Sequence, residues 1–277
     1  CDWSSDVCSS DLGPNIVVVN MPGAASLTAA NYLANIAPRD GTEMLMVVQS
    51  LPLMQVAGSD KARFDLEKFS WIGNMSDSAN TVLAWKTAGV KTLDDARRLE
   101  LIMGSTTASS LGGIYPAIMN KALGTKFRII HGYESGDAID LAMERGEVNA
   151  RLVSWSALKA YRANWLRDGL VNIFAQVGLR RESDLDAPLL TELAANERDR
   201  EVLGFYSSLV AFGRAVTLGP GAPAERVETL RRAFDAAVAD PALIAEAEKQ
   251  GLELRRSEEH TSELQSHHDL VCRLLLE

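Results

Sequence analysis

The native part of this sequence lacks cysteine. The chain has three cysteines: Cys1, Cys8 and Cys272. All of them lie in terminal segments that we interpret as translated sequencing-adapter DNA. The codons permitted for RSEEHTSELQS (256–266) include a string whose reverse complement translates as DWSSDVCSSDL (2–12). A match of this length excludes coincidence, so segments 1–12 and 256–277 are left out of the fold and motif reasoning.

Histidine, net charge and long apolar runs are also scarce once these segments are removed. The only histidine left is His131. Removing eight acids and two arginines changes the net charge from −9 to −3. With no basic stripe to neutralise phosphates, nucleic-acid binding is excluded as a main activity. No apolar run approaches the ~20 residues of a membrane span. A cysteine-free chain is compatible with an oxidising compartment.

Residues 13–255 alternate between short apolar runs and amphipathic stretches. The predicted strands are 16–19, 44–48, 69–72, 81–85, 101–103, 127–130, 148–153 and 171–175. The predicted helices are 25–37, a short helix capped by Thr92, a helix ending near 123, then 137–145, 156–166, 223–239 and a last one that stops at Gly251. This rhythm of strand and helix predicts an α/β protein.

The same rhythm occurs twice, and it predicts two α/β lobes instead of one continuous sheet. We expect each lobe to contain a mainly parallel sheet flanked by helices. The first lobe comprises 13–87 and 207–255, and the second comprises 88–206. Two extended crossings, near 85–90 and 206–212, would join the lobes and form a hinge.

Two strand-to-helix loops carry the clearest binding signal. The loop 104–110 runs through small residues into a helix, so its backbone N–H groups are open to an anion. Its hydroxyl donors are Ser105, Thr106, Thr107, Ser109 and Ser110. The loop 131–136 should lie beside it, because the carboxyl ends of parallel strands share one edge. The alternative for either loop is an ordinary capped helix start. A nucleotide-binding P-loop is not supported, because its lysine is missing.

The sequence offers no catalytic constellation. His131 has no identifiable nucleophile or carboxylate partner, so a loop-orienting role is favoured over that of a general base. Glu144 and Glu147 at the end of a helix are interpreted as solvated. Trp155 follows a strand and could form a wall of a pocket. These absences favour a binding protein over an enzyme.

Several segments resemble one family in order along the chain: NIVVVNMPGAASLTAANYLANIAPRDGT, FSWIGNM, LGTKFRIIHGY, LAMERGEVNARLVSW and PGAPAERVETLRRAFDA. They are similar to the extracytoplasmic receptors of tripartite tricarboxylate transporters, the Bug-type solute receptors. The resemblance implies a two-lobed, periplasmic-binding-protein-like fold of type II. It also implies a monomeric periplasmic protein that binds a small carboxylate and delivers it to a membrane permease, without cofactor or metal.

The resemblance also implies where the solute binds. Loop 105–110 corresponds to the family's second-lobe loop, and 132–136, with Tyr133, Ser135 and Gly136, lies beside it. In the first lobe the matching residues are Gln49 and Ser50. Family members begin with a signal, a strand, a glycine-rich loop and a helix, which adapter residues replace here. We therefore expect an N-terminally truncated chain that binds weakly or not at all.

Two other functions remain open at this point. A ligand-sensing domain of a regulatory protein uses the same two-lobed architecture. An enzyme built on this architecture ranks third, with His131 as the residue whose loss would abolish turnover.

Overall fold

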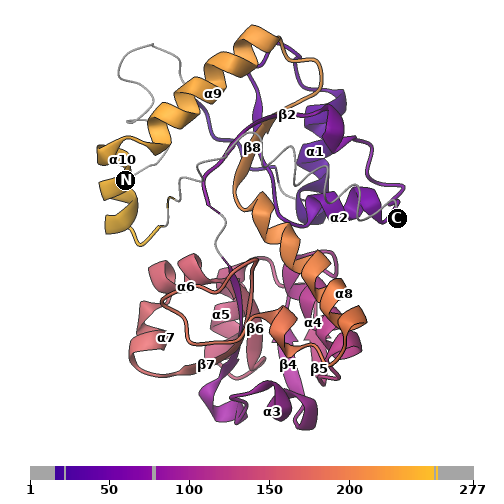
Figure 1. The fold of residues 1–277 in the computed structure, drawn as a ribbon, viewed down its shortest axis with the longest axis vertical. Helices are drawn as coiled ribbons and strands as arrows, with labels where there is room; N and C mark the ends of the chain where they lie inside the picture. Colours follow the sequence, from indigo (N-terminus) through magenta and orange to yellow (C-terminus); the bar gives the residue numbers. More distant parts are fainter. Residues whose placement is uncertain (1–15, 22, 77–78, 253, 255–277) are drawn as a thin grey trace.

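The computed structural model describes residues 16–21, 23–76, 79–252 and 254, so the two predicted adapter segments lie outside the described residues. It shows an α/β fold with two lobes, one above the other in Figure 1. The strands are β1 (Met44–Met46), β2 (Ser70–Asn74), β3 (Asn80–Trp85), β4 (Leu101–Gly104), β5 (Phe127–Ile130), β6 (Ala150–Ser154), β7 (Val171–Val177) and β8 (Ala215–Leu218). The predicted α/β class and the two-lobed fold are confirmed.

Helices surround both sheets. The α-helices are α1 (Leu27–Asn35), α2 (Leu51–Val56), α3 (Leu93–Arg98), α4 (Leu111–Ala122), α5 (Gly136–Glu144), α6 (Trp155–Tyr161), α7 (Ala163–Arg167), α8 (Glu197–Ser208), α9 (Ala224–Val238) and α10 (Pro241–Lys249). The 3₁₀ helices are η1 (Ala24–Ser26), η2 (Leu66–Lys68), η3 (Lys86–Ala88), η4 (Leu190–Leu193) and η5 (Leu209–Phe212). None of the described helices combines the length and the apolar character needed to cross a membrane.

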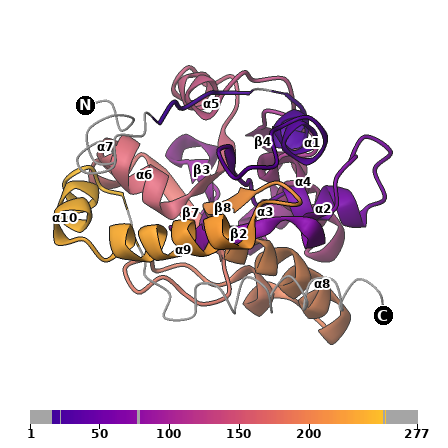
Figure 2. The same ribbon diagram turned by 90° about the horizontal axis from the view of Figure 1, so that it is seen from above.

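The smaller sheet has the order β1-β8-β2. Trp71 of β2 packs with α1 in one core cluster, and its neighbour Ile72 packs with α9 in another. Figure 2 shows α1 and α9 on opposite sides of β8. The prediction of a mainly parallel sheet is wrong here, because β8 is antiparallel to both neighbours. The chain leaves the first lobe after β2 and returns to it at β8. Because β8 comes back from the second lobe, its direction is opposite to that of β2.

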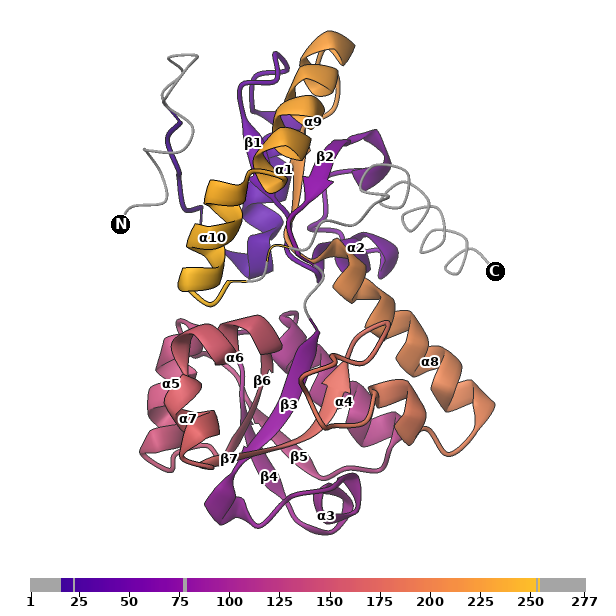
Figure 3. The ribbon, with the colours of Figure 1, turned by 60° about the vertical axis from the view of Figure 1, so that its left-hand side comes forward.

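The larger sheet has the order β5-β4-β6-β3-β7. β4 is parallel to β5 and β6, whereas β3 is antiparallel to β6 and β7. Alternation along β3 places Val82 in the core cluster with α3, α4 and α8, and Leu83 in the cluster with α5, α6 and α7. The larger sheet is thus covered by helices on both faces (Figure 3).

Two chain crossings join the lobes, and both differ from the prediction. The outward crossing precedes β3, because residues up to Trp85 pair within the larger sheet. The returning segment 206–212 is helical, in α8 and η5, and not extended. Asn74 holds the crossings together, since its Nδ2 donates to the Ala211 carbonyl at 2.9 Å and its Oδ1 accepts from the Arg214 N–H at 2.9 Å. The residue boundaries of the lobes stay a prediction.

The predicted strand 16–19 does not form. Its residues make no strand pairing, and Val17 is 76% exposed. The helix predicted over 25–37 is shortened to α1, because Ala24, Ala25 and Ser26 have positive φ angles. The structure also contains α2, α8 and β8, which the sequence pattern did not predict.

Candidate functional site

One edge of the larger sheet faces the smaller lobe. The parallel strands β4, β5 and β6 all end at this edge, and the antiparallel β3 begins there. The crossing from β2 enters at the same edge, and Asn80 at the start of β3 is in register with Ser154 at the end of β6. Both predicted anion loops follow strands that end here. The topology therefore brings them together, as expected for ligand loops of an open α/β sheet.

The loop between β4 and α4 folds back on itself. The hydroxyls of Ser105 and Ser110 both donate to the Thr107 carbonyl, at 2.9 and 2.8 Å, and their oxygens lie 3.0 Å apart. A Cβ atom at Gly113 would lie 2.6 Å from the Thr107 carbonyl oxygen, so the close return of the loop requires glycine. The hydroxyl protons of Ser105 and Ser110 thus hold the loop and are not available to a ligand.

The start of α4 has no side-chain cap. Ser110 occupies the N-cap position of α4 but makes no cap hydrogen bond. The neighbouring helices differ: Ser135 accepts from the Ala138 N–H at the start of α5, and Ser154 accepts from the Ala157 N–H at the start of α6. Among these three helices, α4 alone presents a first turn without a side-chain cap. Such N–H groups, together with the positive end of the helix dipole, favour an anion.

The loop between β5 and α5 is hydrogen-bonded to the first loop. The Gly132 N–H donates to the Thr106 carbonyl at 3.0 Å, and the Tyr133 N–H donates to the Ser105 carbonyl at 3.4 Å. Gly132 has a φ of 106°, which favours glycine. Tyr133 is half-buried, and burial raises the pKa of its phenol. The two loops therefore form a single unit, and His131 in the second loop is exposed.

The first-lobe residues reach this edge through Asn80, which the sequence analysis missed. Asn80 Nδ2 donates to Gln49 Oε1 at 3.0 Å, and Asn80 is buried. Ser50 is also buried and stands at the N-cap of α2, where its side chain makes no cap hydrogen bond. The sequence signal for Asn80 was a polar residue opening an apolar strand. That signal is weak, because such residues are also common in turns.

Trp155 lies at the same edge but its ring is enclosed. It is 6% exposed, and its Nε1 donates to Asp184 Oδ1 at 2.8 Å. Lys159 Nζ stands 5.1 Å from the ring centroid and 2.7 Å from Asp184 Oδ2. Trp155 therefore packs in the core cluster that contains α5 and α7, below the edge of the sheet, and its ring is not a free pocket wall.

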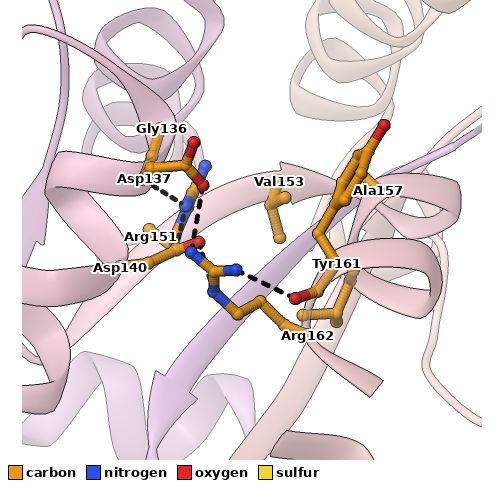
Figure 4. Close-up of a pocket in the computed structure, with 9 residues that line it drawn as sticks. Gly136, Asp137, Asp140, Arg151, Val153, Ala157, Tyr161 and Arg162 are labelled. Atoms are coloured by element: carbon orange, nitrogen blue, oxygen red, sulfur yellow. Dashed lines mark hydrogen bonds and ion pairs between the residues drawn. The ribbon is translucent and has the colours of Figure 1, made fainter. Parts of the chain in front are cut away.

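A cavity of about 180 Å³ lies beside this edge, between α5, β6 and α6 (Figure 4). Its lining residues are Gly136, Asp137, Asp140, Arg151, Val153, Ala157, Leu158, Tyr161 and Arg162. Of these, only Gly136 was predicted as a site residue. An arginine in the strand ARLVS gives no sequence signal, because alternation alone does not distinguish a buried arginine from an exposed one. Among the described residues, no group of histidine, cysteine and carboxylate side chains could hold a metal ion.

No protein-family model matches the sequence, and no curated protein matches it. Solved structures are similar in fold. BugD, a periplasmic binding protein, is 18% identical, with a TM-score of 0.69 over 94% of this chain and 85% of that chain. A protein from R. palustris with adipate is 18% identical, with a TM-score of 0.68 over 96% of this chain and 88% of that one.

MatC from Rhodopseudomonas palustris with bound malate is 17% identical, with a TM-score of 0.66 over 91% of this chain and 85% of that chain. At these identities the likeness shows the fold. The chain has the fold of the Bug-type solute-binding proteins, as the resemblance in sequence predicted.

Proposed function

We propose that this protein is a solute-binding receptor for a small organic anion and that the β4–α4 loop holds a carboxylate of the solute. The observation that carries the proposal is the first turn of α4, which has no side-chain cap. The similar structures that contain malate and adipate support a carboxylate as the recognised group.

Backbone amides suit this task. They present N–H donors at fixed positions, and the aligned peptide dipoles of a helix place about half a positive charge at its N-terminus. Amides recognise the carboxylate and leave the rest of the solute unspecified. Thr106, Thr107 and Ser109 border these amides, and Ser135 retains its hydroxyl proton because its oxygen is the acceptor in the cap.

The second part of the proposal concerns closure of the two lobes over the solute. Gln49 belongs to the loop after β1, and its hydrogen bond to Asn80 spans the two sheets. Gln49 and Ser50 would then complete the site from the first lobe. Tyr133 and the edge supported by Trp155 would border the solute from the second lobe.

We further propose an extracytoplasmic location and a membrane permease as the partner that receives the solute. The support is the fold, because BugD is a periplasmic binding protein. Receptors of this type bind and release their solute without turnover, so we infer a binding protein and not an enzyme.

A thermal-shift panel of mono-, di- and tricarboxylates, with matched amides and alcohols, tests the proposal. Because we expect weak binding, the panel should reach about 10 mM, which detects a Kd near 1 mM. We expect at least one carboxylate to raise Tm while its neutral analogue does not. A panel in which no carboxylate raises Tm more than its neutral analogue would overturn the proposed function.

A further inference from the structure

We propose that the cavity between α5, β6 and α6 is a second binding site, separate from the β4–α4 loop, and that it takes a short-chain monocarboxylate. Two arginines, two aspartates and an apolar wall line it. The inference rests on its charge balance and shape, and it stands whether or not the proposed function is correct.

Among the charged lining side chains that are at most 25% exposed, positive charge is in excess, because Arg151 and Arg162 face a single carboxylate, that of Asp140. Asp140 is paired through both oxygens: Oδ1 accepts from Arg151 Nη1, and Oδ2 lies 2.8 Å from Arg162 Nε. Two guanidinium groups thus share one buried carboxylate. The other acid, Asp137, pairs with Arg162 at 3.0 Å, but its side chain is 84% exposed and water screens its charge. An entering anion would compensate the excess.

Burial destabilises the charged guanidinium of Arg151, and a bound anion would offset this effect. Its side chain is 10% exposed, and burial lowers the pKa of its guanidinium despite the carboxylate of Asp140. Its Nη1 also donates to the Gly136 carbonyl at 2.9 Å. A Cβ atom at Gly136 would lie 3.0 Å from Arg151 Nη2, so glycine leaves room for the guanidinium at the cavity (Figure 4). Charge-assisted hydrogen bonds from arginine to a carboxylate are among the stronger ones in proteins.

The rest of the cavity is apolar. Val153, Ala157 and Leu158 line it, and Tyr161 is an exposed residue at its border. A volume of about 180 Å³ is far more than one water molecule requires. A ligand with one anionic end and a short hydrocarbon chain would match both parts. A dicarboxylate would not, because its second carboxylate would lie against the apolar wall or Asp137.

The α4 helix of the first site and the cavity lie on opposite faces of the larger sheet. The cavity is on the face covered by α5, α6 and α7, whereas α4 packs on the other face. Variants can therefore separate them. Ala157→Leu would fill the cavity without removing an ion pair, and Ala163→Leu, at an exposed position of α7, is the matched control.

The test is a titration of the full chain with butanoate, followed by ¹H–¹⁵N NMR, with butan-1-ol and sodium chloride as reference ligands. We expect saturable shifts at Gly136, Arg151 and Ala157, no saturation with butan-1-ol or chloride, and loss of binding in Ala157→Leu but not in Ala163→Leu. Arg162→Gln should weaken the binding of butanoate at least tenfold.

Three results would overturn the inference. They are shifts that stay linear in butanoate concentration, shifts confined to residues 105–112, and unchanged binding in Ala157→Leu. The second of these would support the proposed carboxylate site while removing the second one. If Arg162→Gln fails to fold, Ala157→Leu and its control still decide the question.

Discussion

Asn80 Nδ2 donates a hydrogen bond of 3.0 Å to Gln49 Oε1, which joins the start of β3 in one lobe to the loop after β1 in the other. Asn80 is buried, so removing its partner would leave a desolvated amide. We predict that Gln49→Ala and Asn80→Ala are non-additive, with a coupling free energy of about 0.5–1.5 kcal/mol. Urea unfolding of both single variants and the double variant measures it. Additive effects would mean that the bond does not couple the lobes in solution.

The tight crossing at Gly213 gives a second prediction. A Cβ atom there would lie 1.5 Å from the Ser76 carbonyl oxygen, and φ is +24°. Gly213→Ala should lower the free energy of unfolding by at least about 3 kcal/mol, through overlap and backbone strain. Gly124, with φ of +70° and nothing within 4 Å, is the control. Gly124→Ala should cost about 1 kcal/mol. If chemical denaturation shows the same loss of unfolding free energy for both variants, the close packing of Gly213 against Ser76 is not present in solution.

The buried ion pairs of Asp140 should contribute more to the free energy of unfolding than an exposed ion pair does. The Asp140 side chain is 8% exposed and holds both Arg151 and Arg162. Asp140→Asn leaves these guanidinium groups without their shared charge and should destabilise the protein by about 3–5 kcal/mol. Asp94, 74% exposed in its pair with Arg97, is the matched control, for which we expect about 0–1 kcal/mol. Urea midpoints compare the two variants, and similar losses would refute the buried network.

Asp95 gives a prediction about pH. Hydrogen bonds from the Lys91 N–H, the Thr92 hydroxyl and Arg98 lower the pKa of its carboxyl to about 2, from 3.8. Because the folded pKa is depressed, the stabilisation is complete above the unfolded value of 3.8 and is lost as the pH falls towards 2.

Carboxyl ¹³C NMR should therefore show Asp95 titrating near pH 2. Thr92→Ala, which removes one donor from the capping box of α3, should move the pKa of Asp95 upward. A titration near pH 4 in the unaltered chain would show that the capping box does not form.

Elements with local signals were predicted well from the sequence. Strand 127–130 coincides with β5, and the apolar stripe of 223–239 coincides closely with α9. Thr92, predicted as a helix cap, also marked the start of α3 correctly. In each case the periodicity, the cap or the turn residues lie within the element itself.

Elements that depend on distant partners were not predicted. The β-branched run at 16–19 has strand propensity, but it makes no ladder. The direction of β8 follows from the return crossing, which local sequence does not encode. The candidate site shows the same division. The loops 105–110 and 131–136 were predicted from their composition, whereas Asn80 and Arg151 are brought to this edge only by the topology of the larger sheet.

Gly112 is the position at which binding of a carboxylate at the start of α4 can be tested. A Cβ atom there would meet no atom closer than the Ser105 Oγ at 3.6 Å, so a side chain fits. We propose a ¹H–¹⁵N NMR titration of the unaltered chain, Gly112→Asn and Gly112→Asp with the panel's strongest carboxylate. We expect saturable shifts over 105–112 in the unaltered chain and in Gly112→Asn. Gly112→Asp should bind the carboxylate at least tenfold more weakly, because its own fixed carboxylate competes with the ligand. Equal affinity of the Asn and Asp variants, or shifts that leave 105–112 unmoved, would contradict this expectation.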